Sequence, residues 1–74
     1  MEQVAHTIQY AKFMIFLKDA DRAATESALW KLLQLSLTPF SVALAAVKAL
    51  ESEGGKLDIA ATPYFKHLAG KYPK

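Results

Sequence analysis

Residues 2–18 form a stretch without glycine or proline that is apolar on two opposite sides of a helix. One row has helical spacings of four, three and four residues and consists of Val4, Ile8, Ala11 and Ile15. The second row consists of Tyr10, Phe13, Met14 and Leu17. A helix that is apolar on two faces is buried on two faces. We therefore predict that one row packs inside the subunit and that the other contacts a second chain.

Two alternatives remain open for this stretch. The helix could lie at the centre of its own bundle, with both rows covered by the same chain. The run from Phe13 to Leu17 could also be a short buried strand, because short apolar runs do not distinguish strand from helix.

The residues are assigned to core and contact surface as follows. The predicted contact surface for a second copy or a partner consists of Tyr10, Phe13, Met14 and Leu17, with Trp30 as a further anchor. Trp30 borders the apolar arc of its helix, and tryptophan is enriched at interface hot spots, although a partly buried wall residue is the alternative. The predicted core consists of Val4, Ile8, Ile15, Leu29, Leu33, Phe40, Leu44, Val47 and Leu50.

Capping residues mark the ends of the next two helices. Asp19 or Asp21 can accept a hydrogen bond from the first backbone amides of a helix over residues 22–36. Thr38 is the expected N-cap of the following helix, with Pro39 at its first position. That helix is expected to end at Glu53, where the glycines at 54 and 55 can adopt a left-handed conformation.

The remaining segment is short and less regular. Residues 56–59 alternate polar and apolar side chains over too few positions to indicate a strand. A short helix is expected over residues 63–69, capped by Gly70, with residues 71–74 as a frayed tail. The sequence thus predicts one all-α domain over residues 1–74, a small bundle of three main helices plus a short C-terminal fourth.

The composition favours association with another chain. A monomer of 74 residues buries only about 60% of its unfolded surface. Nevertheless 53% of the residues are hydrophobic, above the ~45–50% of an average domain. Large exposed apolar patches are uncommon on monomers, so we expect a homo-oligomer, with a dimer favoured, or a protein partner.

Catalytic and metal-binding patterns are missing. The chain has no cysteine, and His6 and His67 are 61 residues apart without a nearby ligand pattern. Asp19 and Asp21 resemble the start of a calcium loop, but Ala23 and Ala24 replace its third ligand and its glycine. No phosphate-binding glycine loop precedes a helix. We expect no catalytic residue, no metal site and no cofactor.

Nucleic-acid binding is the alternative function. Residues 56–74 carry four lysines and one aspartate, and possible anion or nucleic-acid contacts are Lys56, Lys66, His67, Lys71 and Lys74, beside Tyr64 and Tyr72. The segment AVKALESEGGKL resembles the end of the reading helix and the start of the wing in a winged-helix protein. That helix, however, offers few of the arginine, lysine, asparagine and glutamine side chains that read bases.

The N-terminus and the longest apolar stretch bear on location. The first six residues lack a secretory signal, so the chain is expected to be mature from Met1. Residues 28–50 are interrupted by Lys31, Gln34, Pro39 and Lys48, which argues against a membrane span. Membrane-surface binding through residues 13–17, between Lys12 and Lys18, is a weaker possibility. We expect a cytoplasmic, non-catalytic interaction protein that acts as an adaptor, inhibitor or assembly factor.

Overall fold

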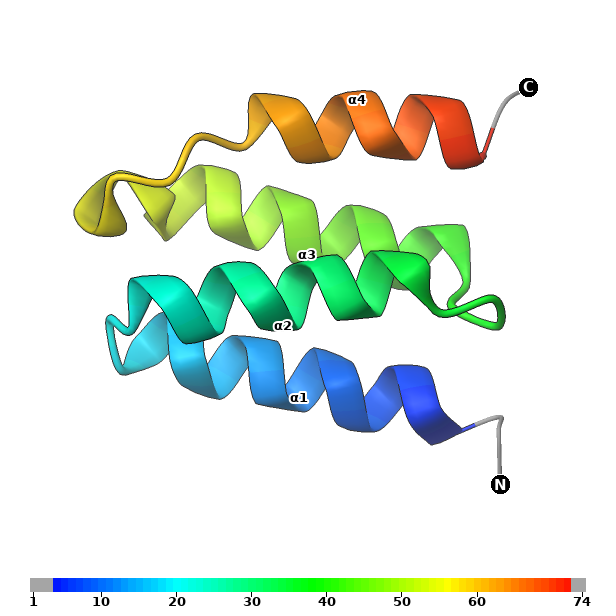
Figure 1. Cartoon of the computed structure of the whole chain (residues 1–74), viewed down its shortest axis with the longest axis horizontal. Coiled ribbons are helices and arrows are strands. Elements are labelled where there is room, and N and C mark those ends of the chain that lie inside the picture. Colours follow the sequence, from blue (N-terminus) through cyan, green and yellow to red (C-terminus); the bar gives the residue numbers. More distant parts are fainter. Residues whose placement is uncertain (1–3, 73–74) are drawn as a thin grey trace.

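The computed structural model describes residues 4–72, which form helices that run back and forth as antiparallel neighbours (Figure 1). The elements are α1 (Ala5–Lys18), α2 (Arg22–Gln34), α3 (Phe40–Glu53), the 3-10 helix η2 (Gly54–Leu57) and α4 (Thr62–Lys71). Residues 4–72 contain no strand. The predicted all-α class with three main helices and a shorter fourth is confirmed, and the strand considered for residues 13–17 is excluded.

Local hydrogen bonds explain where α2 and α3 begin. The Asp21 carboxylate accepts a hydrogen bond from the Ala24 amide at 3.1 Å, so the aspartate cap of α2 is confirmed at the second of the two candidates. The predicted Thr38 cap is wrong. The Thr38 hydroxyl is buried and donates to the Leu32 carbonyl at 3.0 Å, while Pro39 occupies the N-cap position of α3.

The end of α3 also differs from the expectation. Gly54 has a φ of −64°, in the right-handed region, and the chain continues through η2 to Asp58, which has a φ of 59°. A Cβ at position 54 would lie 2.8 Å from the Ile59 carbonyl oxygen and 3.0 Å from Cδ1 of Leu50. Glycine is needed there because the chain after η2 folds back and places the Ile59 carbonyl against Gly54. No glycine among the described residues is left-handed.

The C-terminal residues are bound to the bundle. α4 begins one residue earlier than predicted and continues through Gly70 to Lys71. The Lys71 ammonium donates to the carbonyls of Leu33 and Leu35, the second at 3.0 Å, and the Tyr72 hydroxyl donates to the Thr38 carbonyl at 2.6 Å. The prediction of a frayed tail is therefore wrong for Lys71 and Tyr72, while residues 73–74 lie outside the described residues.

All four α-helices contribute to the core. Its buried hydrophobic residues are Phe13, Leu17, Ala28, Leu29, Leu32, Leu33, Ala43, Ala46, Val47, Leu50, Leu57, Ile59, Tyr64 and Leu68. The predictions for Leu29, Leu33, Val47 and Leu50 are confirmed, and Leu44 is partly buried against the core.

Four core predictions are wrong, because Val4, Ile8, Ile15 and Phe40 are exposed. On α1 the inward side is the row with the aromatic residues, because the exposed Lys12 and Lys18 border the other row. Phe40 lies outside the core with its ring edge-on to Tyr72, at 5.3 Å between centroids.

The molecule is flat, with extents of 30 × 28 × 15 Å. α1 and α4 form its two long borders, and α2 and α3 lie between them (Figure 1). α1 packs on α2 and, less extensively, on α3. Because α1 is a border helix, only one of its two apolar rows is covered by the rest of the chain.

Candidate interaction surface

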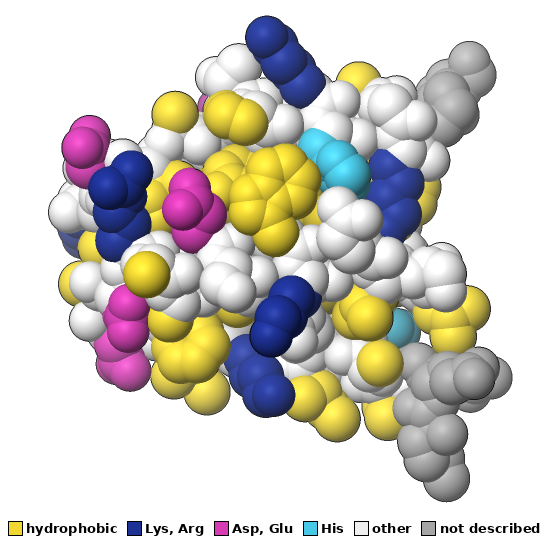
Figure 2. All heavy atoms as spheres, in the orientation of Figure 1, with side chains coloured by type: hydrophobic (Ala, Val, Ile, Leu, Met, Phe, Trp, Pro, Cys, Tyr) yellow, Lys and Arg dark blue, Asp and Glu magenta, His cyan; other side chains and the backbone are white. Residues whose placement is uncertain are grey.

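The uncovered row of α1 is the main apolar feature of the surface. Val4 is 47% exposed, Ile8 is 54% exposed and Ile15 is 56% exposed, and Ala11 between them is also exposed. We call Val4, Ile8, Ala11 and Ile15 the α1 outer face. Hydrophobic side chains are visible along the lower border of the molecule, where α1 runs (Figure 2). The four-three-four spacing is that of the seam between two packed helices.

The contact surface predicted from the sequence is placed differently. Phe13 is completely buried and Leu17 is nearly so, which leaves neither able to touch a partner. Tyr10, Met14 and Trp30 are partly buried and pack against the core. The expectation that α1 has one inward and one outward apolar row agrees with the structure, but the two rows are exchanged.

Charged residues could have identified the outward row. Lys12 and Lys18 are exposed and border the α1 outer face on its two sides, whereas no charged residue falls within the buried row. Charged side chains are almost never fully buried without a partner. The positions of the lysines on the helix, more than the sizes of the apolar residues, therefore indicate which side meets water.

A groove of about 370 Å³ runs between α1 and α2, beside the α1 outer face. Its lining consists of Gln9, Lys12, Phe16, Ala24, Ser27, Ala28 and Lys31. The Gln9 side-chain amide donates to the Ala28 carbonyl at 3.0 Å and ties the two helices together. Lys12 and Lys31 are both exposed. Figure 2 shows basic side chains over the boundary between α1 and α2.

Among residues 4–72, no ion pair joins either of these two lysines to a carboxylate. The ion pair recorded among residues 4–72 joins Lys56 to Glu53 at 3.7 Å. α1 contains no aspartate or glutamate at all between Ala5 and Lys18. The groove therefore combines an apolar lining with two positive charges of the same sign, an arrangement that attracts an anionic group.

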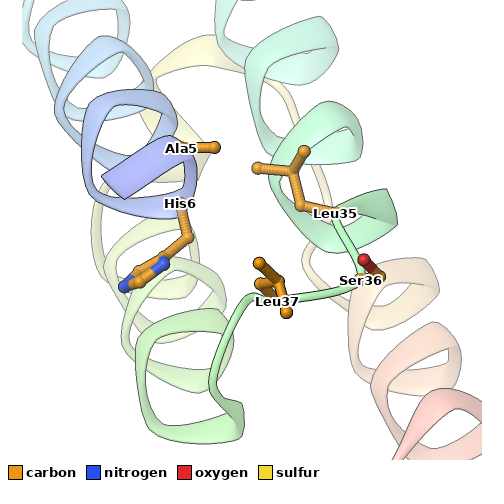
Figure 3. Close-up of a pocket in the computed structure, with 5 residues that line it drawn as sticks. All are labelled: Ala5, His6, Leu35, Ser36 and Leu37. Carbon is orange, nitrogen blue, oxygen red and sulfur yellow. The ribbon is translucent and has the colours of Figure 1, made fainter. Parts of the chain in front are cut away.

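A second hollow of about 300 Å³ lies between the start of α1 and the loop that joins α2 to α3. In Figure 3 the side chains of Ala5 and Leu35 face each other across it, and that of Leu37 lies below them, between His6 and Ser36. Its lining also includes His6, whose Nδ1 atom is buried without a hydrogen-bond partner, and Ser36. In Figure 3 the His6 imidazole and the Ser36 hydroxyl lie on opposite sides of Leu37 and point apart, so this arrangement is not that of a nucleophile and its base.

Trp30 belongs to an aromatic cluster that joins α2 to α4. Its ring lies 4.7 Å from the Tyr64 ring and 5.1 Å from the His67 ring, the latter in an edge-on arrangement. The Tyr64 hydroxyl donates to the Glu26 carboxylate at 3.1 Å. Burial, reinforced by the Glu26 carboxylate, raises the pKa of Tyr64 to about 12. The cluster holds the helices together, and it corresponds to the wall alternative for Trp30.

The basic C-terminal residues do not form one patch. Lys56 pairs with Glu53, His67 packs on Trp30, and Lys71 faces α2, where burial lowers its pKa. Lys66 is exposed and Lys74 lies outside the described residues.

The structure also places Tyr64 and the segment that resembles a winged helix, the other two features of the nucleic-acid alternative. Tyr64 is buried, which removes it as a stacking surface for bases. The wing of the winged-helix resemblance is absent, because residues 54–57 form a 3-10 helix and residues 4–72 contain no strand.

Neither a metal cluster nor a membrane span is found in the described part of the chain. Residues 4–72 contain no group of three or more histidine, aspartate or glutamate side chains placed to hold a metal ion. Within the same range, no helix has both the length and the apolar character needed to cross a bilayer. Comparison with protein-family models, with curated proteins and with solved structures found no match to this chain.

Proposed function

We propose that this chain is a non-catalytic protein-interaction module and that the α1 outer face is its contact surface. The observation that carries the proposal is the exposure of Val4, Ile8 and Ile15 in one helical row, opposite the buried Phe13 and Leu17. Covering a valine or isoleucine side chain completely is worth about 1.5–3 kcal/mol relative to leaving it exposed. Another protein chain can supply that cover.

A helix of the other chain is the best match in shape. The row repeats in the pattern of a helix–helix seam, and Ala11 at its middle lets a neighbouring backbone come close. In an antiparallel pair of identical chains, Ile8 of one copy lies opposite Ala11 of the other, so a large side chain meets a small one. The row spans roughly 16 Å along the helix. Because that contact is small, we propose reversible self-association, with a dimer as the first form.

The test is light scattering coupled to size exclusion, over a range of protein concentrations and in high salt. We expect the wild-type mass to rise with concentration towards multiples of 8.2 kDa. The double variant Ile8→Glu/Ile15→Glu is expected to stay monomeric with unchanged helical circular dichroism. Ala45→Glu/Ser52→Glu is the matched control, since it adds two carboxylates at exposed positions of α3.

Two results would contradict this proposal. One is a wild-type chain that remains monomeric at every concentration and salt. The other is an Ile8→Glu/Ile15→Glu chain that associates as strongly as the α3 control, which would place the contact elsewhere on the molecule.

A further inference from the structure

We infer that the α1 outer face and the adjoining groove between α1 and α2 bind one amphipathic helix whose apolar row is bordered by aspartate or glutamate. This inference rests on the proposed function, because it names the chemistry of the partner for the same surface. It is carried by the charges that surround the apolar row.

Those charges are positive on both sides of the row and along the groove. Lys12 and Lys18 border it on α1, and Lys31 of α2 lines the same groove as Lys12. One exposed carboxylate, Asp19, caps the end of α1 beside Lys18, one turn beyond Ile15. The others lie away from the row: Asp21 just before α2, and Glu51, Glu53 and Asp58 around the end of α3. Acidic side chains accordingly gather towards the left end in Figure 2, where both of these connections lie.

The groove places the positive charges where they can bind the acidic side chains of a partner helix. Phe16, Ala24 and Ala28 give it an apolar lining, and Lys12 and Lys31 contribute its positive charges. A helix that lays its apolar row on Ile8 and Ile15 presents its bordering side chains over this groove. Carboxylates at that border meet two ammonium groups, whereas lysines at the same border would be repelled.

A second copy of this chain is a poorer match at low salt. When two α1 helices pair, Lys12 and Lys18 of one copy approach the same lysines of the other copy and are repelled by them. α1 has no carboxylate that could offset this repulsion. Raising the salt concentration screens this repulsion, so self-association strengthens with salt. Binding of an acidic helix has the opposite salt dependence, and the sign of the salt effect separates the two occupants.

An anionic membrane surface also attracts lysines but matches the row less well. Interfacial helices place tryptophan, phenylalanine or leucine in the bilayer and enrich their polar face in lysine and arginine. The α1 outer face contains none of those three residue types, and α1 carries two lysines and no arginine. The row therefore suits a protein helix better than a lipid surface.

The probes are two synthetic helical peptides of about three heptads, each with leucine at positions a and d. The acidic peptide has glutamate at positions e and g, and the basic peptide has lysine there. Fluorescence anisotropy with the full chain at low salt is expected to show about tenfold tighter binding of the acidic peptide, and high salt should reduce this difference.

Charge reversal tests whether the groove sets this preference. In Lys12→Glu/Lys31→Glu the preference is expected to reverse, so that the basic peptide binds more tightly than the acidic one. Lys48→Glu/Lys66→Glu is the matched control, because it changes the net charge equally at exposed lysines of α3 and α4. This control should still prefer the acidic peptide. Circular dichroism of each variant verifies that the bundle is folded.

Several outcomes overturn the inference. Equal affinity of the wild-type chain for both peptides would do so, and so would a control variant that reverses the preference as fully as the groove variant. If the wild-type chain binds vesicles of phosphatidylcholine and phosphatidylserine but binds neither peptide, the partner of this surface is a lipid membrane and not a helix. If neither peptide and no vesicle binds, the inference is refuted. The same result would also refute the α1 outer face as a contact surface for a helix.

The double variant Ile8→Glu/Ile15→Glu separates this inference from the proposed function. If the wild-type chain binds both peptides equally and this variant binds neither, the contact surface stands and the charge preference fails. If the variant binds the acidic peptide as tightly as the wild-type chain does, the contact surface fails.

Discussion

Two glycines are expected to respond in opposite directions to the same substitution by alanine. Gly54 lies where the chain after η2 folds back, and a Cβ there would lie 2.8 Å from the Ile59 carbonyl oxygen. Gly70 lies inside α4, and a Cβ there would meet nothing within 4 Å. Both glycines have the negative φ that alanine adopts freely. The difference between them is therefore one of space alone.

The structure sets the size of each effect. Forcing an extra methyl group into a well-packed site costs about 1–3 kcal/mol, and at position 54 the nearest atom belongs to the backbone and cannot rotate away. We therefore expect Gly54→Ala to destabilise the protein by about 1–2 kcal/mol. Gly70→Ala replaces a poor helix former by the best one and should stabilise it by about 0.5–1 kcal/mol.

Thermal unfolding followed by circular dichroism measures both changes. For a domain of this size each kcal/mol moves Tm by roughly 4–8 °C. Urea unfolding should give the same order of stability with unchanged m values. A Gly54→Ala chain that is as stable as Gly70→Ala would refute the reasoning, since it would show that the Ile59 carbonyl does not lie close against Gly54. Gly55→Ala is a further reference, because nothing lies within 4 Å of a Cβ there.

Two further predictions concern buried polar groups. The Thr25 hydroxyl is buried without a hydrogen-bond partner, so Thr25→Val should stabilise the protein by about 1 kcal/mol in urea unfolding, whereas Thr25→Ser, which keeps the hydroxyl and loses the methyl group, should not. A loss of stability in Thr25→Val would show that the hydroxyl is paired. The native state holds the Tyr64 proton up to a pKa of about 12, against 10.0 for an unperturbed tyrosine. The contribution of the protonated Tyr64 to the free energy of unfolding is thus complete below pH 10. It falls by up to about 2–3 kcal/mol as the pH rises towards 12. Urea unfolding at several alkaline pH values should show a shallower loss in Tyr64→Phe than in the wild-type chain, with the contribution of Tyr72 common to both.

The helices of this protein could be located from the sequence because their ends are marked locally. Asp21 caps α2 with its own side chain, and Pro39 precedes α3 directly. These signals act over three or four residues, so they do not depend on the rest of the fold. The orientation of α1 is a different problem, because both of its rows are apolar and only the bordering Lys12 and Lys18 mark the side that meets water.

The C-terminal part was mispredicted because its stabilising contacts come from far along the chain. Lys71 and Tyr72 are polar residues next to a glycine and a proline, a pattern typical of a loose end. In the structure both donate hydrogen bonds to backbone carbonyls that precede them by 34 to 38 residues. Phe13 and Leu17, which the sequence analysis assigned to the surface, are buried for a related reason, since α2 and α3 cover that side of α1.

These long-range bonds of α4 have a consequence for the order in which the chain folds. α1 and α2 are joined by a turn of three residues, so they can pair with little loss of chain entropy. The bonds from Tyr64, Lys71 and Tyr72 to Glu26, Leu33, Leu35 and Thr38 close loops of 34 to 38 residues. Such contacts form after local ones. We therefore expect α4 to dock last during folding and to detach first during unfolding.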